Sequence, residues 1–73
     1  MSAVVKHEFA VAGMHCGGCV NSVTRAVSQL AGVHTVEVSL EKNAATVEYD
    51  GTAIKSAAIV AAIEAAGFEA SAR

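Results

Sequence analysis

The spacing of apolar residues switches back and forth along this chain, and those switches restrict the folds open to it. Alternation of apolar with polar residues, which buries one face of a strand, predicts strands over residues 4–11, 33–41 and 45–50. Apolar residues that recur every three or four positions predict amphipathic helices over residues 17–31 and 54–66. Residues 68–72 can add a short last strand at a sheet edge. The predicted order is β-α-β-β-α-β.

This order of elements predicts an α+β, ferredoxin-like βαββαβ sandwich. In that architecture a four-stranded antiparallel sheet carries two helices on one face. Lys42-Asn43-Ala44 is polar and can turn the chain between the second and third strands. Gly32 and Gly67 stand where the two helices should end, since glycine readily closes a helix. We expect residues 1–73 to form one domain.

Composition argues against several classes of function. The net charge is −2 and no run of Lys or Arg is present, so we expect no nucleic-acid binding. A core this small leaves little room for a substrate cavity, so we do not expect an enzyme. No apolar stretch is long enough to insert into a bilayer, and the first residues lack a secretory signal. We therefore expect a cytoplasmic protein, although a processed signal or excision from a larger protein would leave the same sequence.

Two cysteines, Cys16 and Cys19, lie where the first loop passes into the first helix. The spacing lets both sulfurs face one ion, and Gly17 and Gly18 let the backbone bend around it. The start of a helix offers N–H groups and the positive end of the helix dipole, which favour a thiolate. Thiolates select soft ions such as Cu(I), Zn(II) or Hg(II). Metal binding is the expected chemistry.

The number of ligands favours Cu(I) among these ions. A structural zinc site uses four ligands, and only one cysteine pair is present. His7 lies in a predicted strand and His34 follows the far end of the first helix, so neither is placed to complete a tetrahedron. Two thiolates satisfy Cu(I), and a partner's thiolates could enter the vacant positions. The pair therefore favours transfer of an ion over permanent storage.

The segment Gly13-Met14-His15-Cys16-Gly17-Gly18-Cys19, the Val23/Val27/Leu30 helix and the late Ala66-Gly67-Phe68 together resemble the heavy-metal-associated domain family. The likeness covers about residues 4–72 and is nearest to small bacterial copper chaperones of the CopZ type. It implies Cu(I) held by Cys16 and Cys19. It also implies transfer to a copper-exporting P-type ATPase or a copper-responsive regulator, and a Met14 side chain that points inward and supports the loop.

Two residues depart from the family's commonest pattern. Thr or Ser usually stands at the position of His15, which is either an exposed loop residue or a modulator of metal affinity. Phe68 should close the core and shield the site, where soluble chaperones often carry Tyr, Lys or His. Phenylalanine there also resembles metal-binding domains fused to heavy-metal ATPases, so the free chaperone and the excised ATPase domain both remain open.

Other functions fit the same motif less well. A mercury or zinc carrier of the same fold is the second hypothesis, and Zn(II), Hg(II) and Ag(I) are further candidate ions. A small thiol oxidoreductase is the third, but thioredoxin-like proteins need a proline facing the cysteine pair, and this chain has none. We expect a monomer without metal, and exposed thiolates could bridge two copies through one ion.

Overall fold

The computed structural model describes residues 4–15 and 17–73. Its elements follow the predicted order: β1 (Val4–Ala12), α1 (Gly17–Ser28), β2 (Val33–Ser39), β3 (Ala44–Asp50), α2 (Ser56–Ala65) and β4 (Glu69–Ala72). Within the part of the chain that is described, no helix has the length and apolar character needed to cross a bilayer.

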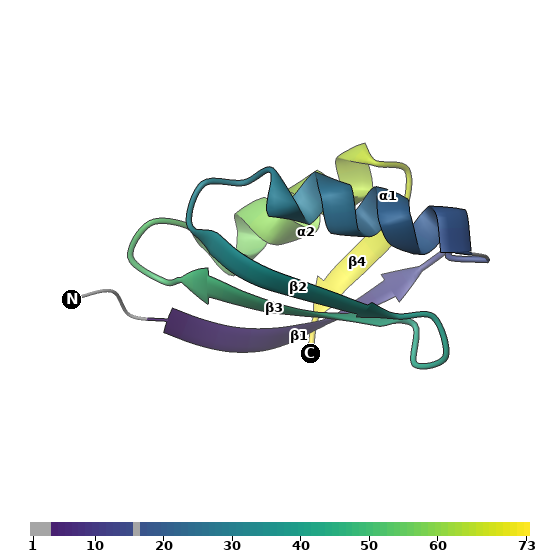
Figure 1. Cartoon of the computed structure of the whole chain (residues 1–73), viewed down its shortest axis with the longest axis horizontal. Helices are drawn as coiled ribbons and strands as arrows, with labels where there is room; N and C mark the ends of the chain where they lie inside the picture. Colours follow the sequence, from purple (N-terminus) through teal and green to yellow (C-terminus); the bar gives the residue numbers. More distant parts are fainter. Residues whose placement is uncertain (1–3, 16) are drawn as a thin grey trace.

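One antiparallel sheet forms the base of the molecule, with strand order β2-β3-β1-β4. β1 pairs with β3 from Val4 to Ala10 and with β4 from Phe9 to Ala12, so it joins the two halves of the sheet. Both helices lie on the same face of the sheet (Figure 1). The predicted ferredoxin-like fold is confirmed, including the place of the last strand at an edge.

The core lies between the sheet and the helices. Strand alternation turns Phe9 and Val11 of β1, with Val47 of β3, toward the helices, and all three are at most 1% exposed. Val23 and Val27 of α1 and Ile59 and Ile63 of α2 cover them and are 0% exposed. Each such side chain contributes roughly 1.5–3 kcal/mol by leaving water. The pattern of large apolar residues therefore determines which faces meet.

The helices are shorter than the apolar periodicity predicted. α1 ends at Ser28, not at residue 31. After Ser28 the hydrogen bonds span three residues instead of four, since the Leu30 N–H donates to the Val27 carbonyl at 3.1 Å. α2 begins at Ser56, not at residue 54, because the Ile54 N–H donates to the Asp50 carbonyl at 3.0 Å in the preceding turn. Ala58 and Ala66, which the pattern placed on the apolar stripe, are both exposed.

The hairpin between β2 and β3 also begins earlier than predicted. The turn spans residues 40–43, and the Asn43 N–H donates to the Leu40 carbonyl at 3.3 Å. Asn43 has φ of 50°, in the left-handed region that asparagine tolerates better than most residues. Leu40 and Glu41 therefore belong to the turn, whereas Ala44 belongs to β3.

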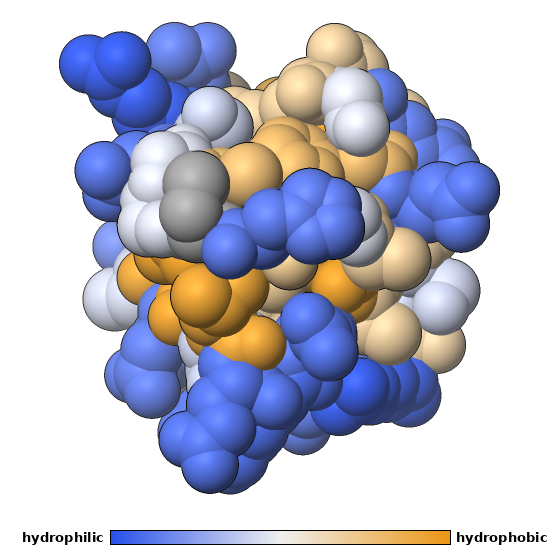
Figure 2. All heavy atoms as spheres, turned by 90° about the vertical axis from the view of Figure 1, so that its right-hand side faces the viewer, coloured by the Kyte–Doolittle hydropathy of each residue, from blue (hydrophilic) through white to orange (hydrophobic). Residues whose placement is uncertain are grey.

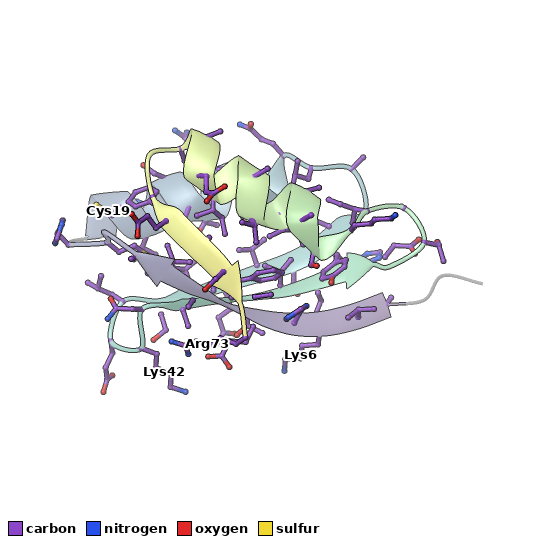
Figure 3. The ribbon with its side chains drawn as sticks, turned by 180° about the vertical axis from the view of Figure 1, so that it is seen from behind. Lys6, Cys19, Lys42 and Arg73 are labelled. Carbon is purple, nitrogen blue, oxygen red and sulfur yellow. The ribbon has the colours of Figure 1, made fainter. Side chains whose placement is uncertain are left out.

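Arg73 fixes the far end of the short edge strand β4. Its N–H donates to the Glu8 carbonyl at 3.0 Å, and its guanidinium donates to the Glu8 carboxylate at 2.6 Å. A second guanidinium nitrogen lies 3.4 Å from the Lys42 carbonyl, on the sheet face away from the helices (Figure 3). The Arg73 carbonyl lies 3.2 Å from Nε2 of His7. The edge strand is thus held by contacts with β1 and the hairpin.

Candidate metal centre

The candidate centre is built on the connection between β1 and α1. β1 ends at Ala12, and Gly13 turns the chain with φ of +96°. The Met14 side chain is only 5% exposed and joins the core, as expected of a residue that supports the loop. His15 is exposed, and Gly17 begins α1. Cys16 lies outside the described residues, so its predicted role stays a prediction.

Cys19 lies in the first turn of α1 and is half-buried (Figure 3). It packs against the buried core cluster, as Val20 and Phe68 also do. The first turn of a helix presents backbone N–H groups that lack partners within the helix, and such groups favour a negatively charged ligand or a thiolate. The fold therefore puts the Cys19 sulfur at one end of the molecule, in surroundings suited to a soft cation.

The turn that ends α2 brings Phe68 to this end of the molecule. The Phe68 N–H donates to the Ile63 carbonyl at 3.4 Å and the Gly67 N–H to the Glu64 carbonyl at 3.0 Å, which is the Schellman pattern. Gly67 has φ of +101°, as the residue that reverses the chain in this motif requires. The turn directs Phe68 back onto the core, where it is half-buried.

Phe68 also lies against Gly13. A Cβ atom built on Gly13 would lie 3.6 Å from Cδ1 of Phe68, which is ordinary van der Waals contact. The aromatic ring therefore borders the start of the β1–α1 connection, and its role in shielding a metal site stays a prediction. Gly13 itself was not among the predicted site residues, although a glycine directly after a strand is a signal for a strained turn.

His7 and His34 lie in different surroundings, and neither belongs to a cluster of metal-ligating side chains among the described residues. The His7 ring stacks on Phe9 with centroids 4.6 Å apart, and its Nδ1 lies 3.4 Å from the Tyr49 hydroxyl. His34 is exposed on β2. Of the residues in ranges 4–15 and 17–73, no three His, Cys, Asp or Glu side chains are grouped to hold a metal ion. Within those ranges the structure supplies no four-ligand zinc site.

The end of the molecule that carries the β1–α1 connection has a mixed surface (Figure 2). Apolar atoms gather near its middle, and hydrophilic side chains surround them. Leu40, from the β2–β3 hairpin, is 39% exposed. An ion bound at this end would thus lie at the surface, within reach of another molecule.

Comparison with known sequences agrees with this geometry. The sequence model of the heavy-metal-associated domain matches residues 8–69, most of the 73-residue chain. The chain belongs to the heavy-metal-associated domain family. The matched range of this heavy-metal-associated domain runs from β1 through the β1–α1 connection and both helices to the first residue of β4.

Relatives of this heavy-metal-associated domain differ greatly in length. It is 38% identical over 66 residues to the copper chaperone CopZ of Enterococcus hirae, covering 90% of this chain and 96% of that protein. It is 48% identical over 62 residues to copper-transporting ATPase 2 of Homo sapiens, covering 85% of this chain and only 4% of that protein. Two transporting ATPases from plants are likewise covered over only 6% and 7% of their length.

A solved structure shows the same fold. A copper binding domain from HMA7, a P-type ATPase, superposes with a TM-score of 0.91 and 40% sequence identity, covering 93% of this chain and 92% of that domain. The fold is therefore shared with a copper binding domain of a P-type ATPase.

Proposed function

We propose that this heavy-metal-associated domain carries Cu(I) on the thiolates of Cys16 and Cys19 and passes it on by ligand exchange. The observation that supports this most is the place of Cys19, half-buried in the first turn of α1 at one end of the molecule. The similarity to the copper chaperone CopZ over 96% of that protein adds weight. Copper is the cargo here and is not a structural part of the fold.

Ligand chemistry favours Cu(I) over the other soft ions. Cu(I) is satisfied by two thiolates, whereas a structural Zn(II) site takes four ligands. The ranges 4–15 and 17–73 contain no group of three or more suitable side chains that could supply a complete zinc site. Ag(I) and Hg(II) also accept two thiolates, so we expect them to compete for the same pair.

Transfer requires that a partner's sulfur can reach the bound ion. The β1–α1 connection lies at the surface, with His15 and Gly17 both exposed. An incoming thiolate can therefore make a third bond to the ion before one of the original bonds breaks, and Cu(I) keeps its charge throughout. We propose a copper-exporting P-type ATPase domain as the acceptor, with a copper-responsive regulator as a second candidate.

A second candidate function is that of one metal-binding domain within a larger heavy-metal ATPase. The 48% identity to a 62-residue part of copper-transporting ATPase 2 favours it, as does Phe68 beside the metal loop. The chemistry of Cys16 and Cys19 would be the same, but the acceptor would be a membrane part of the same protein.

We further propose a cytoplasmic location, because the thiols must stay reduced to bind the ion and cytosolic thiols are kept reduced. We propose a monomer without metal and a copper-bridged dimer when protein exceeds the acceptor. The role is that of a carrier, not of an enzyme or a nucleic-acid-binding protein.

Native mass spectrometry of the reduced protein with graded Cu(I) tests the proposal. We expect one Cu(I) per chain, with a two-chain species only at high protein concentration. Cys16→Ser, Cys19→Ser and the double variant should lose that binding, whereas the matched Ser22→Ala variant, on the exposed face of α1, should keep it. Equal Cu(I) binding by the double variant would refute the proposal.

Two further measurements separate the alternatives. Competition between Cu(I) and Zn(II) for the reduced protein identifies a zinc carrier if Zn(II) displaces Cu(I). An insulin-reduction assay identifies a thiol oxidoreductase, for which we expect no activity above that of the double cysteine variant. Incubation of the loaded protein with a metal-free copper ATPase domain, followed by separation, tests transfer itself.

A further inference from the structure

The turn between β3 and α2 carries the dipeptide Asp50-Gly51, which contains the only aspartate of the sequence. Asp50 is half-buried at the end of β3, and Gly51 and Thr52 after it are exposed, so water reaches this part of the backbone. The turn lies at the end of the molecule opposite the β1–α1 connection (Figure 1). The chemistry of this dipeptide is therefore separate from that of the candidate metal centre.

An aspartate followed by glycine can react with its own backbone. The amide nitrogen of Gly51 attacks Cγ of the protonated Asp50 carboxyl group, so that an N–Cγ bond forms and the Cγ–OH bond breaks. The hydroxyl group and the amide proton leave together as water, and a cyclic succinimide remains. Glycine allows a close approach because it has no Cβ beside the attacking nitrogen. Water then opens the ring at either carbonyl, which regenerates aspartate or gives isoaspartate.

Thr52 holds the Asp50 side chain in place. The Thr52 backbone N–H donates to Oδ1 of Asp50 at 2.9 Å, and the Thr52 hydroxyl donates to the same oxygen at 2.6 Å. Hydrogen bonds to a carboxylate are stronger than those between neutral groups. Rotation of the Asp50 side chain toward the Gly51 nitrogen stretches both bonds, so they oppose closure of the ring.

The main chain of Asp50 is held as well. Its N–H donates to the Gly32 carbonyl at 2.7 Å, and its carbonyl accepts the N–H groups of Ala53 and Ile54 at 3.0 Å each. The peptide unit between Asp50 and Gly51 is planar, so any rotation of its nitrogen toward Cγ also moves the Asp50 carbonyl away from its two donors. The folded turn therefore opposes the reaction at the side chain and at the backbone.

We propose that Asp50-Gly51 is a modification site that isomerises to isoaspartate without an enzyme, and that the hydrogen bonds from Thr52 restrain the reaction in the folded protein. One water molecule leaves when the succinimide forms and one returns when it opens, so no other reactant is needed. A chain that has lost these hydrogen bonds by unfolding should react faster.

Isoaspartate at position 50 would alter the connection into α2. The main chain between Asp50 and Gly51 becomes one methylene longer, and the former Asp50 carbonyl becomes part of a free carboxylate. The N–H groups of Ala53 and Ile54 then lose the main-chain acceptor that closes the turn. Ile54 is only 9% exposed and belongs to the core cluster, so the isomerised protein should be less stable than the native protein.

Water labelled with heavy oxygen detects the reaction directly. Each opening of the succinimide places one solvent oxygen in residue 50, whether aspartate or isoaspartate forms. Reduced, metal-free protein is incubated in labelled water at mildly acidic pH, either folded or in urea, and its peptides are analysed by chromatography and tandem mass spectrometry. Fragmentation must locate the label, because Asn43 can form a succinimide of its own with loss of ammonia.

We expect label at Asp50 to accumulate at least about fivefold more slowly in the folded protein than in urea, because only the folded chain has the hydrogen bonds. Thr52→Ala should raise the rate in the folded protein by about threefold or more and leave the rate in urea nearly unchanged. Thr52→Ser keeps the hydroxyl and should stay near the native rate. The matched Thr35→Ala variant changes an exposed threonine of β2 and should react as the native protein does.

Three results would overturn the proposal. Absence of label at Asp50 in urea would exclude the site itself, and equal rates in the folded protein and in urea would exclude restraint by the fold. A Thr52→Ala rate equal to the native rate would exclude the role of Thr52. Circular dichroism measures the unfolded fraction of each variant, and a rise in rate no larger than that fraction accounts for would also count against Thr52.

Discussion

Gly13 and Gly17 lie four residues apart at the two ends of the β1–α1 connection, and alanine at the two positions should have opposite effects. Gly13 has φ of +96°, which an L-residue rarely adopts, whereas Gly17 begins α1 and has no positive φ. A Cβ at Gly13 would meet Phe68 only at 3.6 Å, and a Cβ at Gly17 would meet nothing within 4 Å. Neither substitution is blocked by a clash, so the backbone decides the outcome.

The magnitudes follow from the conformations. Gly13→Ala should destabilise the protein by about 1–2 kcal/mol, the cost of a left-handed L-residue. Gly17→Ala should stabilise it by up to about 1 kcal/mol, because alanine loses less entropy in a helix. The free energy of unfolding of a 73-residue chain is about 4–11 kcal/mol. The destabilising change therefore removes a large part of it and should lower Tm by about 4–16 °C.

Urea and thermal unfolding followed by circular dichroism measure both effects. The protein should be reduced and free of metal, because an ion that binds only the folded state would mask the difference. Equal stability of Gly13→Ala and the native protein would refute the backbone argument. So would a Gly17→Ala variant as unstable as Gly13→Ala, since the loop would then reject any side chain.

Three further changes test other parts of the fold by chemical denaturation. Gly67→Ala, at φ of +101° in open space, should cost about 1–2 kcal/mol, and a smaller cost in Gly67→Asn would support the left-handed assignment. Met14 is only 5% exposed, so Met14→Ala should lower the free energy of unfolding by about 2–5 kcal/mol. Met14→Leu, which keeps the side-chain volume, should lower it by less than about 1.5 kcal/mol. Equal losses in the two variants would contradict a packing role. Arg73→Gln should lower the free energy of unfolding by less than about 1 kcal/mol, because both side chains of the Arg73–Glu8 ion pair are nearly half exposed. A larger loss of stability that persists at high salt would contradict this expectation.

The candidate site was predictable in part. The loop after the first strand and the placement of Cys19 at a helix start followed from glycine content and periodicity, and the structure has both. The burial of Met14 agrees with the packing role that the sequence suggested. The proximity of Phe68 to Gly13 joins residues 55 positions apart, and the family resemblance, not the local pattern, pointed to it.

The ends of the elements were less predictable. Periodicity continues through Leu30, yet α1 stops at Ser28 because local hydrogen bonds and Gly32 at φ of +95° reverse the chain. A Cβ on Gly32 would lie 3.1 Å from the Cβ of Ala53, so a tight contact with a distant turn also disfavours a larger residue there. Apolar spacing reports which side of a segment is buried, and it does not report where the backbone hydrogen bonds change.

The sequence by itself determined the order of strands and helices and the face that each one buries, because periods of two and of three to four residues are properties of local backbone geometry. It also placed the cysteine pair at a loop-to-helix junction. The tertiary structure alone decided that β1 lies between β3 and β4 and that His7 meets Tyr49 and Arg73. These contacts join segments far apart in the chain, and only the closing of the sheet and the packing of the helices on it bring them together.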